Sequence, residues 1–151
     1  DGIDSGRGTT LERALAALLE AQVGVYVVSN TEISRSAKQA ELDSLNNGTD
    51  AARRMNKLQI EGLMMELQAL DQSEQLLEQL TAATGGRLYK PRSFADLEST
   101  YAEVAEELRH QYALYYRPLN TARDGSFRRV KVEVTEPGMQ VSARVGYYAP
   151  K

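Results

Sequence analysis

The first thirty residues carry a helix pattern followed by a strand pattern. Four leucines recur at helical spacing and predict a helix with one buried face: Leu11, Leu15, Leu18 and Leu19. Thr9 and Glu12 stand at capping-box spacing, in which a hydroxyl and a carboxylate each satisfy a free backbone amide at the helix start. The segment VGVYVVSN, residues 23–30, is apolar at odd and even positions alike. Such a segment is typical of a strand covered on both faces, as in a parallel sheet.

A polar stretch separates this strand from the next apolar run. Residues 31–54 are rich in Ser, Asn, Asp and Ala, and we expect a partly helical excursion with NNGTD, residues 46–50, as its turn. Helical spacing then resumes and ends at Gly85 and Gly86, a pair that predicts a left-handed helix end. The apolar positions of that run are Met55, Leu58, Leu63, Leu67, Leu70, Leu76, Leu77, Leu80 and Ala83.

A short strand and a well-marked helix follow. RLYKP, residues 87–91, reads as a strand that stops at Pro91, because proline cannot donate to a ladder. Ser93 and Asp96 stand at capping spacing and begin a helix. Its apolar stripe, in steps of three and four, contains Phe94, Leu97, Tyr101, Val104, Leu108 and Tyr112.

The last forty residues change to a period of two. YALYYRP, residues 112–118, predicts one strand. RRVKVEVT (128–135) and MQVSARVGYY (139–148) alternate apolar and polar positions around the turn residues EPG, which predicts an antiparallel hairpin with one wet face. We therefore expect residues 111–151 to form an antiparallel, three-stranded extension. The helix and strand order of residues 1–110 followed by this antiparallel tail predicts an α/β fold with a mixed sheet.

Composition narrows the possible functions. The length of 151 residues fits one domain with a small appendage. A net charge of −3 and no basic run longer than two residues argue against nucleic acid as a partner. The absence of cysteine excludes disulfides, zinc knuckles and thiol nucleophiles, and no apolar run reaches the length of a membrane span.

Several segments together resemble a known family. DGIDSGRGTTLERAL, VGVYVVS, LEQLTAATGGRLYKP, EVAEELRHQYALYYRP and DGSFRRVKVEV…VSARVGYYAP are similar to the later half of acidobacterial-type von Willebrand factor type A-related proteins. The resemblance implies a partial doubly wound, mostly parallel α/β domain over residues 1–110. Residues 33–71 form a helical insertion by this comparison. A bacterial, extracytoplasmic location, periplasmic or secreted, is also implied.

The resemblance also implies a metal-ion-dependent adhesion site. That site takes an Asp-x-Ser-x-Ser group, a Thr from a later loop, and an Asp usually followed by Gly at the end of the fourth strand. Asp1 and Gly2 match the last element, but no Asp-x-Ser-x-Ser occurs in the chain. We therefore expect the other ligands in an N-terminal half of the domain ahead of Asp1. Because Mg²⁺ takes about six oxygens, we expect Mg²⁺ or Mn²⁺ only in the complete domain and none for this chain alone.

Other polar residues have a structural interpretation beside a functional one. Asp4 and Ser5 could reach the waters of a metal at Asp1, but we expect them to shape the loop. His110 lacks a second histidine or cysteine partner, and we expect a surface or capping role at a helix end. NGT at Asn47 has the glycosylation pattern, and we interpret it as a turn.

Two apolar groups could serve as binding surfaces. Met55, Met64 and Met65 could line a partner groove, but we expect them to fill a helical core. The tail tyrosines could form an aromatic patch, although cross-strand packing within the tail sheet is our preferred interpretation. They are Tyr112, Tyr115, Tyr116, Tyr147 and Tyr148.

Three functions follow from these observations. The favoured one is a non-enzymatic protein-binding or adhesion module without catalytic residues. The second is a hydrolase that uses carboxylates such as Asp1 and Asp4. The third is a structural fragment whose insertion helices assemble with another copy. Because an incomplete parallel sheet exposes an edge strand, we then expect dimerisation or association with the N-terminal half of the same domain.

Overall fold

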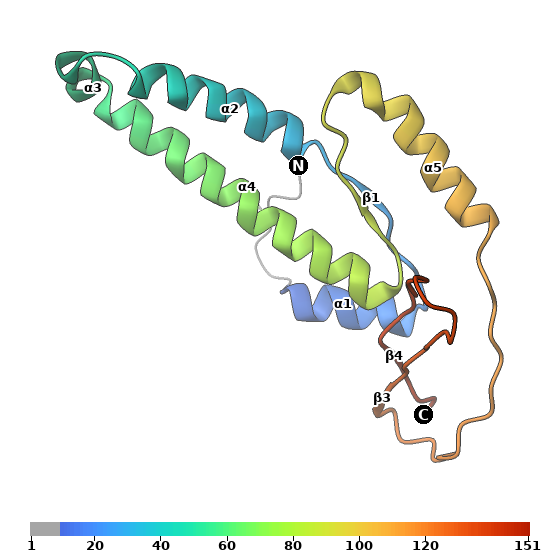
Figure 1. Ribbon diagram of the computed structural model, residues 1–151. Coiled ribbons are helices and arrows are strands. Elements are labelled where there is room, and N and C mark those ends of the chain that lie inside the picture. Colours follow the sequence, from blue (N-terminus) through green and yellow to red (C-terminus); the bar gives the residue numbers. More distant parts are fainter. Residues whose placement is uncertain (1–9) are drawn as a thin grey trace.

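A small pair of parallel strands joins the helices of this chain, and a short antiparallel pair lies near its C-terminus (Figure 1). The computed structural model describes residues 10–151, a mixed α/β arrangement that is mostly helical. In chain order the elements are α1 (Leu11–Glu20), β1 (Val27–Val28), α2 (Thr31–Asn46), α3 (Asp50–Met55), α4 (Lys57–Thr84), β2 (Leu88–Tyr89), the 3-10 turn η1 (Phe94–Asp96), α5 (Leu97–Arg109), β3 (Phe127–Arg129) and β4 (Gly146–Tyr148).

The valine-rich segment forms a parallel pair, as its composition predicts. Val27 lies opposite Leu88 and Val28 opposite Tyr89. The backbone N–H of Ser29 donates to the carbonyl of Tyr89 at 2.9 Å, which extends the pairing beyond β1. Within residues 10–151 the parallel sheet has two strands, so the mixed α/β class is confirmed at this coarse level.

Two glycines allow the chain to leave α4 and enter β2 in a tight space. Gly85 caps α4 with φ +76°, the left-handed conformation that the sequence predicts. A Cβ on Gly86 would lie 1.9 Å from the carbonyl oxygen of Val25, so only glycine fits beside β1. The end of α4 is therefore fixed against the strand pair.

The helices of the predicted insertion form a projecting arm (Figure 1). α2 and α4 lie side by side, and α3 occupies the far end. Leu42 from α2 and Leu63 and Leu70 from α4 are buried between them. The turn expected at NNGTD is present, because Thr49 caps α3 by accepting from the N–H of Ala52 at 3.3 Å.

The methionines of the arm do not fill its core, which corrects our expectation. Met55 is 86% exposed and Met65 is 70% exposed, and Met64 is also exposed. The reason is geometric: α4 turns the leucine face of Leu63 and Leu70 toward the interior. Met64 and Met65 lie on other sides of α4, and Met55 is the last residue of α3.

The starts of α1 and α5 can be compared with the capping residues that the sequence predicts. Thr10 caps α1 by accepting from the N–H of Arg13 at 3.4 Å, and the predicted cap Thr9 lies outside the described residues. Ser93 donates from its backbone N–H to the carboxylate of Asp96 at 2.9 Å, as its spacing predicts. α5 ends at Arg109. Much of the apolar stripe predicted for this helix is exposed, including Phe94 in the preceding 3-10 turn and Tyr101 and Leu108 in α5.

The tail is two-stranded in the structure, and the expected third strand is absent from the described residues. β3 and β4 pair antiparallel, with Arg128 opposite Tyr147, and the N–H of Val130 donates to Val145 at 2.9 Å. Beyond that bond the two halves of the predicted hairpin separate and enclose an open hollow of about 550 Å³. Residues 112–118, which we expected to be a strand, have no strand partner within residues 10–151.

Candidate functional site

The carboxyl ends of β1 and β2 bring polar side chains together at one edge of the strand pair. Ser29 and Thr31 follow β1, and Lys90 follows β2. Ligands of open α/β sheets bind at this edge, since loops from neighbouring strands diverge there. The cluster at this edge is therefore the first place to look for a functional site.

A buried chain of hydroxyl groups begins the cluster. Ser29 donates from Oγ to Oγ1 of Thr31 at 3.1 Å, and the Thr31 N–H donates to Oγ of Ser29 at 3.3 Å. Thr31 in turn donates from Oγ1 to Oε2 of Glu74 at 3.3 Å. Thr31 is fully buried and Ser29 nearly so, and these hydrogen bonds satisfy hydroxyls that would otherwise be costly to bury.

Two cations neutralise the carboxylate at the end of that chain. Arg35 contacts Glu74 at 2.9 Å and Asp71 at 2.8 Å, and it also pairs with Glu32 one turn before it. Lys90 contacts Glu74 at 2.6 Å. Burial alone would raise the pKa of the Glu74 carboxyl, but the hydrogen bonds from Lys90 and Arg35 outweigh it and lower that pKa.

The same contacts also shift the pKa of the lysine. The hydrogen bond to Glu74 raises the pKa of Lys90, and a further hydrogen bond to Glu78 acts in the same direction. Thus the cluster is a charged, hydrogen-bonded junction that fastens the arm to the strand pair. Its carboxylates are already engaged by cations, and no group of three metal-capable side chains occurs within residues 10–151.

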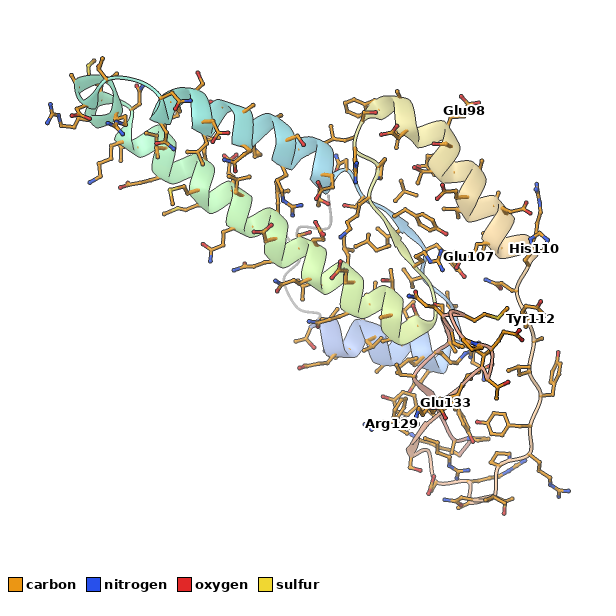
Figure 2. All side chains as sticks on the ribbon, viewed as in Figure 1. Glu98, Glu107, His110, Tyr112, Arg129 and Glu133 are labelled. Atoms are coloured by element: carbon orange, nitrogen blue, oxygen red, sulfur yellow. The ribbon has the colours of Figure 1, made fainter. Side chains whose placement is uncertain are left out.

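A second polar contact fastens α5 to the strand pair. The Tyr89 hydroxyl donates to Oε2 of Glu107 at 2.6 Å, and Arg87 contacts the same oxygen at 2.9 Å. Figure 2 labels Glu107 on the side of α5 toward the strands. Burial and then the hydrogen bond to Glu107 raise the pKa of Tyr89 to about 12.

Asp1, the predicted metal ligand, lies outside the described residues, as do Asp4 and Ser5. The structure therefore gives no geometry for the adhesion site. His110 lies at the C-terminal end of α5, where its Nδ1 is 2.9 Å from the carbonyl oxygen of Glu106 and its side chain is exposed. This is the helix-end position that the sequence predicts.

The tail tyrosines divide into packed and exposed members. Tyr116 and Tyr147 meet edge to face with ring centroids 6.5 Å apart, and Tyr148 packs on Phe127 in the same way at 5.2 Å. In contrast, Tyr112 is 93% exposed and Tyr115 is 95% exposed. Cross-strand packing therefore accounts for only part of the group.

The exposed tyrosines belong to a longer apolar segment, residues 112–119, that follows α5. Leu114 and Leu119 are exposed as well. The segment runs from the end of α5 toward β3 without regular structure, and Figure 2 labels Tyr112 near its start. Large apolar side chains gathered on a surface mark binding sites more often than single exposed residues do.

The junction around Glu74 was not predicted from the sequence, although the chain carries a signal for it. Leu63, Leu67, Leu70, Glu74 and Leu77 follow one another in steps of four and three. Glu74 thus occupies a position on the apolar face of a helix. A carboxylate at such a position needs a buried cation or hydroxyl partner.

In comparisons with known proteins, no protein-family model, no curated protein and no solved structure matches this chain. Within residues 10–151, no helix combines the length and the apolar composition needed to cross a membrane.

Proposed function

We propose that the chain is a non-enzymatic protein-interaction module of the von Willebrand factor type A-like, adhesive kind, acting outside the cytoplasm of a bacterium. The resemblance of its segments to that family supports the class and the location. The parallel strand pair, with polar loops at its carboxyl edge, is compatible with part of a doubly wound sheet. Only if a further N-terminal segment supplied the other ligands would Asp1 contribute to a Mg²⁺ or Mn²⁺ site that takes a carboxylate from the partner.

The observation that carries the proposal is the exposed segment 112–119. It combines strand-forming composition with large side chains that are exposed within residues 10–151, namely Tyr112, Leu114, Tyr115 and Leu119. Tyr112 and Tyr115 supply the rigid, amphipathic rings that are enriched at protein interfaces. Tyr112 and Leu114 lie on the same side of an extended strand, so a partner strand could pair with its backbone while pockets receive these two side chains.

Selection of displayed peptides on the immobilised chain tests this proposal, because a random peptide library assumes no particular partner. We expect selected peptides to lose at least about ten-fold in affinity for Tyr112→Ser and Leu114→Ser. Tyr101→Ser is the matched control, because Tyr101 is an exposed tyrosine on α5 outside the segment. Failure to select any binder, or binders indifferent to both substitutions in the segment, would contradict the proposal.

A further inference from the structure

The tail hairpin is paired at its base and open beyond it. The base is the pairing of β3 with β4, and its last bond runs from the N–H of Val130 to the carbonyl of Val145 at 2.9 Å. Within residues 10–151, no backbone hydrogen bond joins residues 131–135 to residues 140–144, and we call these two ranges the open segments. Residues of both sides line the hollow of about 550 Å³. The backbone groups along the open segments therefore lack the ladder that a hairpin normally provides.

The turn at the far end is formed, and it stands in the register of the base. The N–H of Met139 lies 3.5 Å from the carbonyl oxygen of Glu136, which is the bond that closes a two-residue turn. Counted on from β3 and β4, where Arg128 lies opposite Tyr147, the antiparallel register places Glu136 opposite Met139. The open segments therefore have equal lengths, and they can pair without a shift in register.

The same register separates the side chains of the hairpin onto two faces. Apolar positions fall opposite apolar positions on one face, and polar positions share the other. The apolar pairs are Val130 with Val145, Val132 with Ala143, and Val134 with Val141. The sequence thus fits a closed hairpin in this register, and the open form needs a physical cause.

The turn residues are one cause. The two-residue turns that match the twist of paired strands are types I′ and II′, and both need φ above zero at the first central residue. Pro137 fixes φ at about −65°, and Gly138 has φ +85°, a combination typical of a type II turn. Because a type II turn splays the strands that it joins, the open segments diverge beside it.

Contacts with the end of α4 are a second cause. In a closed ladder the N–H of Val145 would donate to Val130, because a hydrogen-bonded pair exchanges both bonds. It donates instead to the carbonyl of Ala83 at 3.1 Å, and Oγ of Ser142 donates to the carbonyl of Gly86 at 3.1 Å. The ladder and α4 therefore compete for the same N–H group.

We propose that the tail hairpin is a two-state element. In one state the open segments stand apart and residues 142–145 lie on the end of α4, as in the structure. In the other state a continuous antiparallel ladder runs from β3 to the turn, fills the hollow and releases Ala83. Because the two states use the same groups in different pairings, a change at the turn shifts the balance between them. The two states of the hairpin do not depend on the function proposed for residues 112–119.

Substitution at the turn tests this balance. Pro137→Asn places an Asn-Gly pair at the turn, which is the sequence that type I′ turns prefer, and it should favour the closed state. Pro137→Ala is the matched control, because it removes the proline ring without supplying a residue that readily takes φ above zero. Pro137 is exposed, so both variants should keep the helical circular dichroism of the unmodified chain.

Amide hydrogen exchange detects the ladder residue by residue. The N–H groups that point across the hairpin in the closed register are those of Val132, Val134, Val141 and Ala143. We expect Pro137→Asn to slow their exchange at least about ten-fold, while the outward N–H groups of Glu133 and Ser142 stay fast. In Pro137→Ala and in the unmodified chain all six should exchange fast. Equal exchange in the two variants, or slowing without this alternation, would overturn the inference.

Disulfide trapping tests whether the natural turn also reaches the closed state, since the chain has no cysteine of its own. Glu133→Cys and Ser142→Cys, introduced together, lie opposite each other in the closed register at a non-hydrogen-bonded pair, where side chains are closest. This pair should crosslink with Pro137 in place, and at least about ten-fold faster with Pro137→Asn, because the rate follows the closed population. Glu133→Cys with Gln140→Cys is the control for register and should crosslink more slowly. No crosslink with Pro137, equal rates with the two turns, or an equally fast control pair would each contradict the two-state hairpin.

Discussion

Thr31 donates a hydrogen bond of 3.3 Å to Glu74, which lies 43 residues later in the chain. This contact joins the first residue of α2 to α4, and the same carboxylate forms ion pairs with Arg35 and Lys90. One side chain therefore links the strand pair, the start of α2 and the long helix. The position of the arm relative to the strands depends on it.

Replacement of this carboxylate should destabilise the fold. Glu74→Gln leaves Arg35 and Lys90 without their shared partner, and we expect a loss of about 2 kcal/mol in the free energy of unfolding, measured in urea. Glu78→Gln is the matched control, since Glu78 contacts Lys90 at 3.1 Å from an exposed position. It should change stability by about 0.5 kcal/mol or less. Equal effects of the two variants would show that Glu74 has no special role.

The same carboxylate predicts a pH dependence at the acid end. The pKa of folded Glu74 is lowered below its ordinary value of 4.5. Its ion pairs therefore stabilise the fold fully above about pH 4.5, and this contribution is lost as the pH falls through the folded pKa. Urea unfolding at a series of acid pH values should show a shallower loss for Glu74→Gln than for the unmodified chain. Parallel curves would contradict the assignment.

Tyr89 predicts a change at the alkaline end. Its pKa is raised to about 12, so the neutral hydroxyl stabilises the fold below pH 10, its ordinary value. That stabilisation is lost as the pH rises from 10 toward 12. Tyr89→Phe should cost about 1 kcal/mol near neutral pH. In an ultraviolet titration of the unmodified chain, Tyr89 should ionise at a higher pH than the other tyrosines, and this last ionisation should be missing from Tyr89→Phe. If the variant still shows it, the prediction is wrong.

The close approach of Gly86 to β1 predicts a strong response to a single methyl group. A Cβ at Gly86 would overlap the carbonyl oxygen of Val25, and backbone cannot move aside as a side chain can. Gly86→Ala should therefore reduce the free energy of unfolding by about 3 kcal/mol. At Gly24 an added Cβ meets its nearest atom at 3.6 Å, so Gly24→Ala serves as the control. Similar melting temperatures for the two variants would contradict the geometry.

The sequence predicted those elements that local chemistry determines. Gly85 adopts the left-handed cap, and Ser93 and Asp96 form the expected contact, because both depend on neighbours within one turn. The parallel strand pair also followed from valines at odd and even positions alike. In each case the pattern that predicts the element lies within the element itself.

Features that depend on distant contacts were predicted less well. Residues 112–118 have the composition of a strand but lie unpaired, since composition gives strand tendency and not the presence of a partner. The exposure of Met65 was missed because α4 carries large apolar side chains on more than one side, and periodicity alone does not say which side is buried. The junction at Glu74 was missed because Thr31 and Arg35 reach it only through the packing of α2 on α4.

Metal binding can be tested on the chain as it stands. Asp1 supplies one or two of the roughly six oxygens that Mg²⁺ takes, so we expect Mg²⁺ or Mn²⁺ to leave its melting temperature unchanged. The measurement is thermal unfolding with and without each ion, repeated for Asp1→Ala. A stabilisation by metal that disappears in Asp1→Ala would show that this chain binds the ion without further ligands.

Amide hydrogen exchange over residues 112–119 tests the proposed function most directly. In the free chain these amides should exchange as fast as those of an unstructured peptide, because nothing within residues 10–151 pairs with them as a strand. Binding of a selected peptide should slow their exchange while the amides of α5 remain unchanged. Slow exchange of residues 112–119 in the free chain would mean that the segment is already paired within the molecule, which would contradict its role as the binding surface.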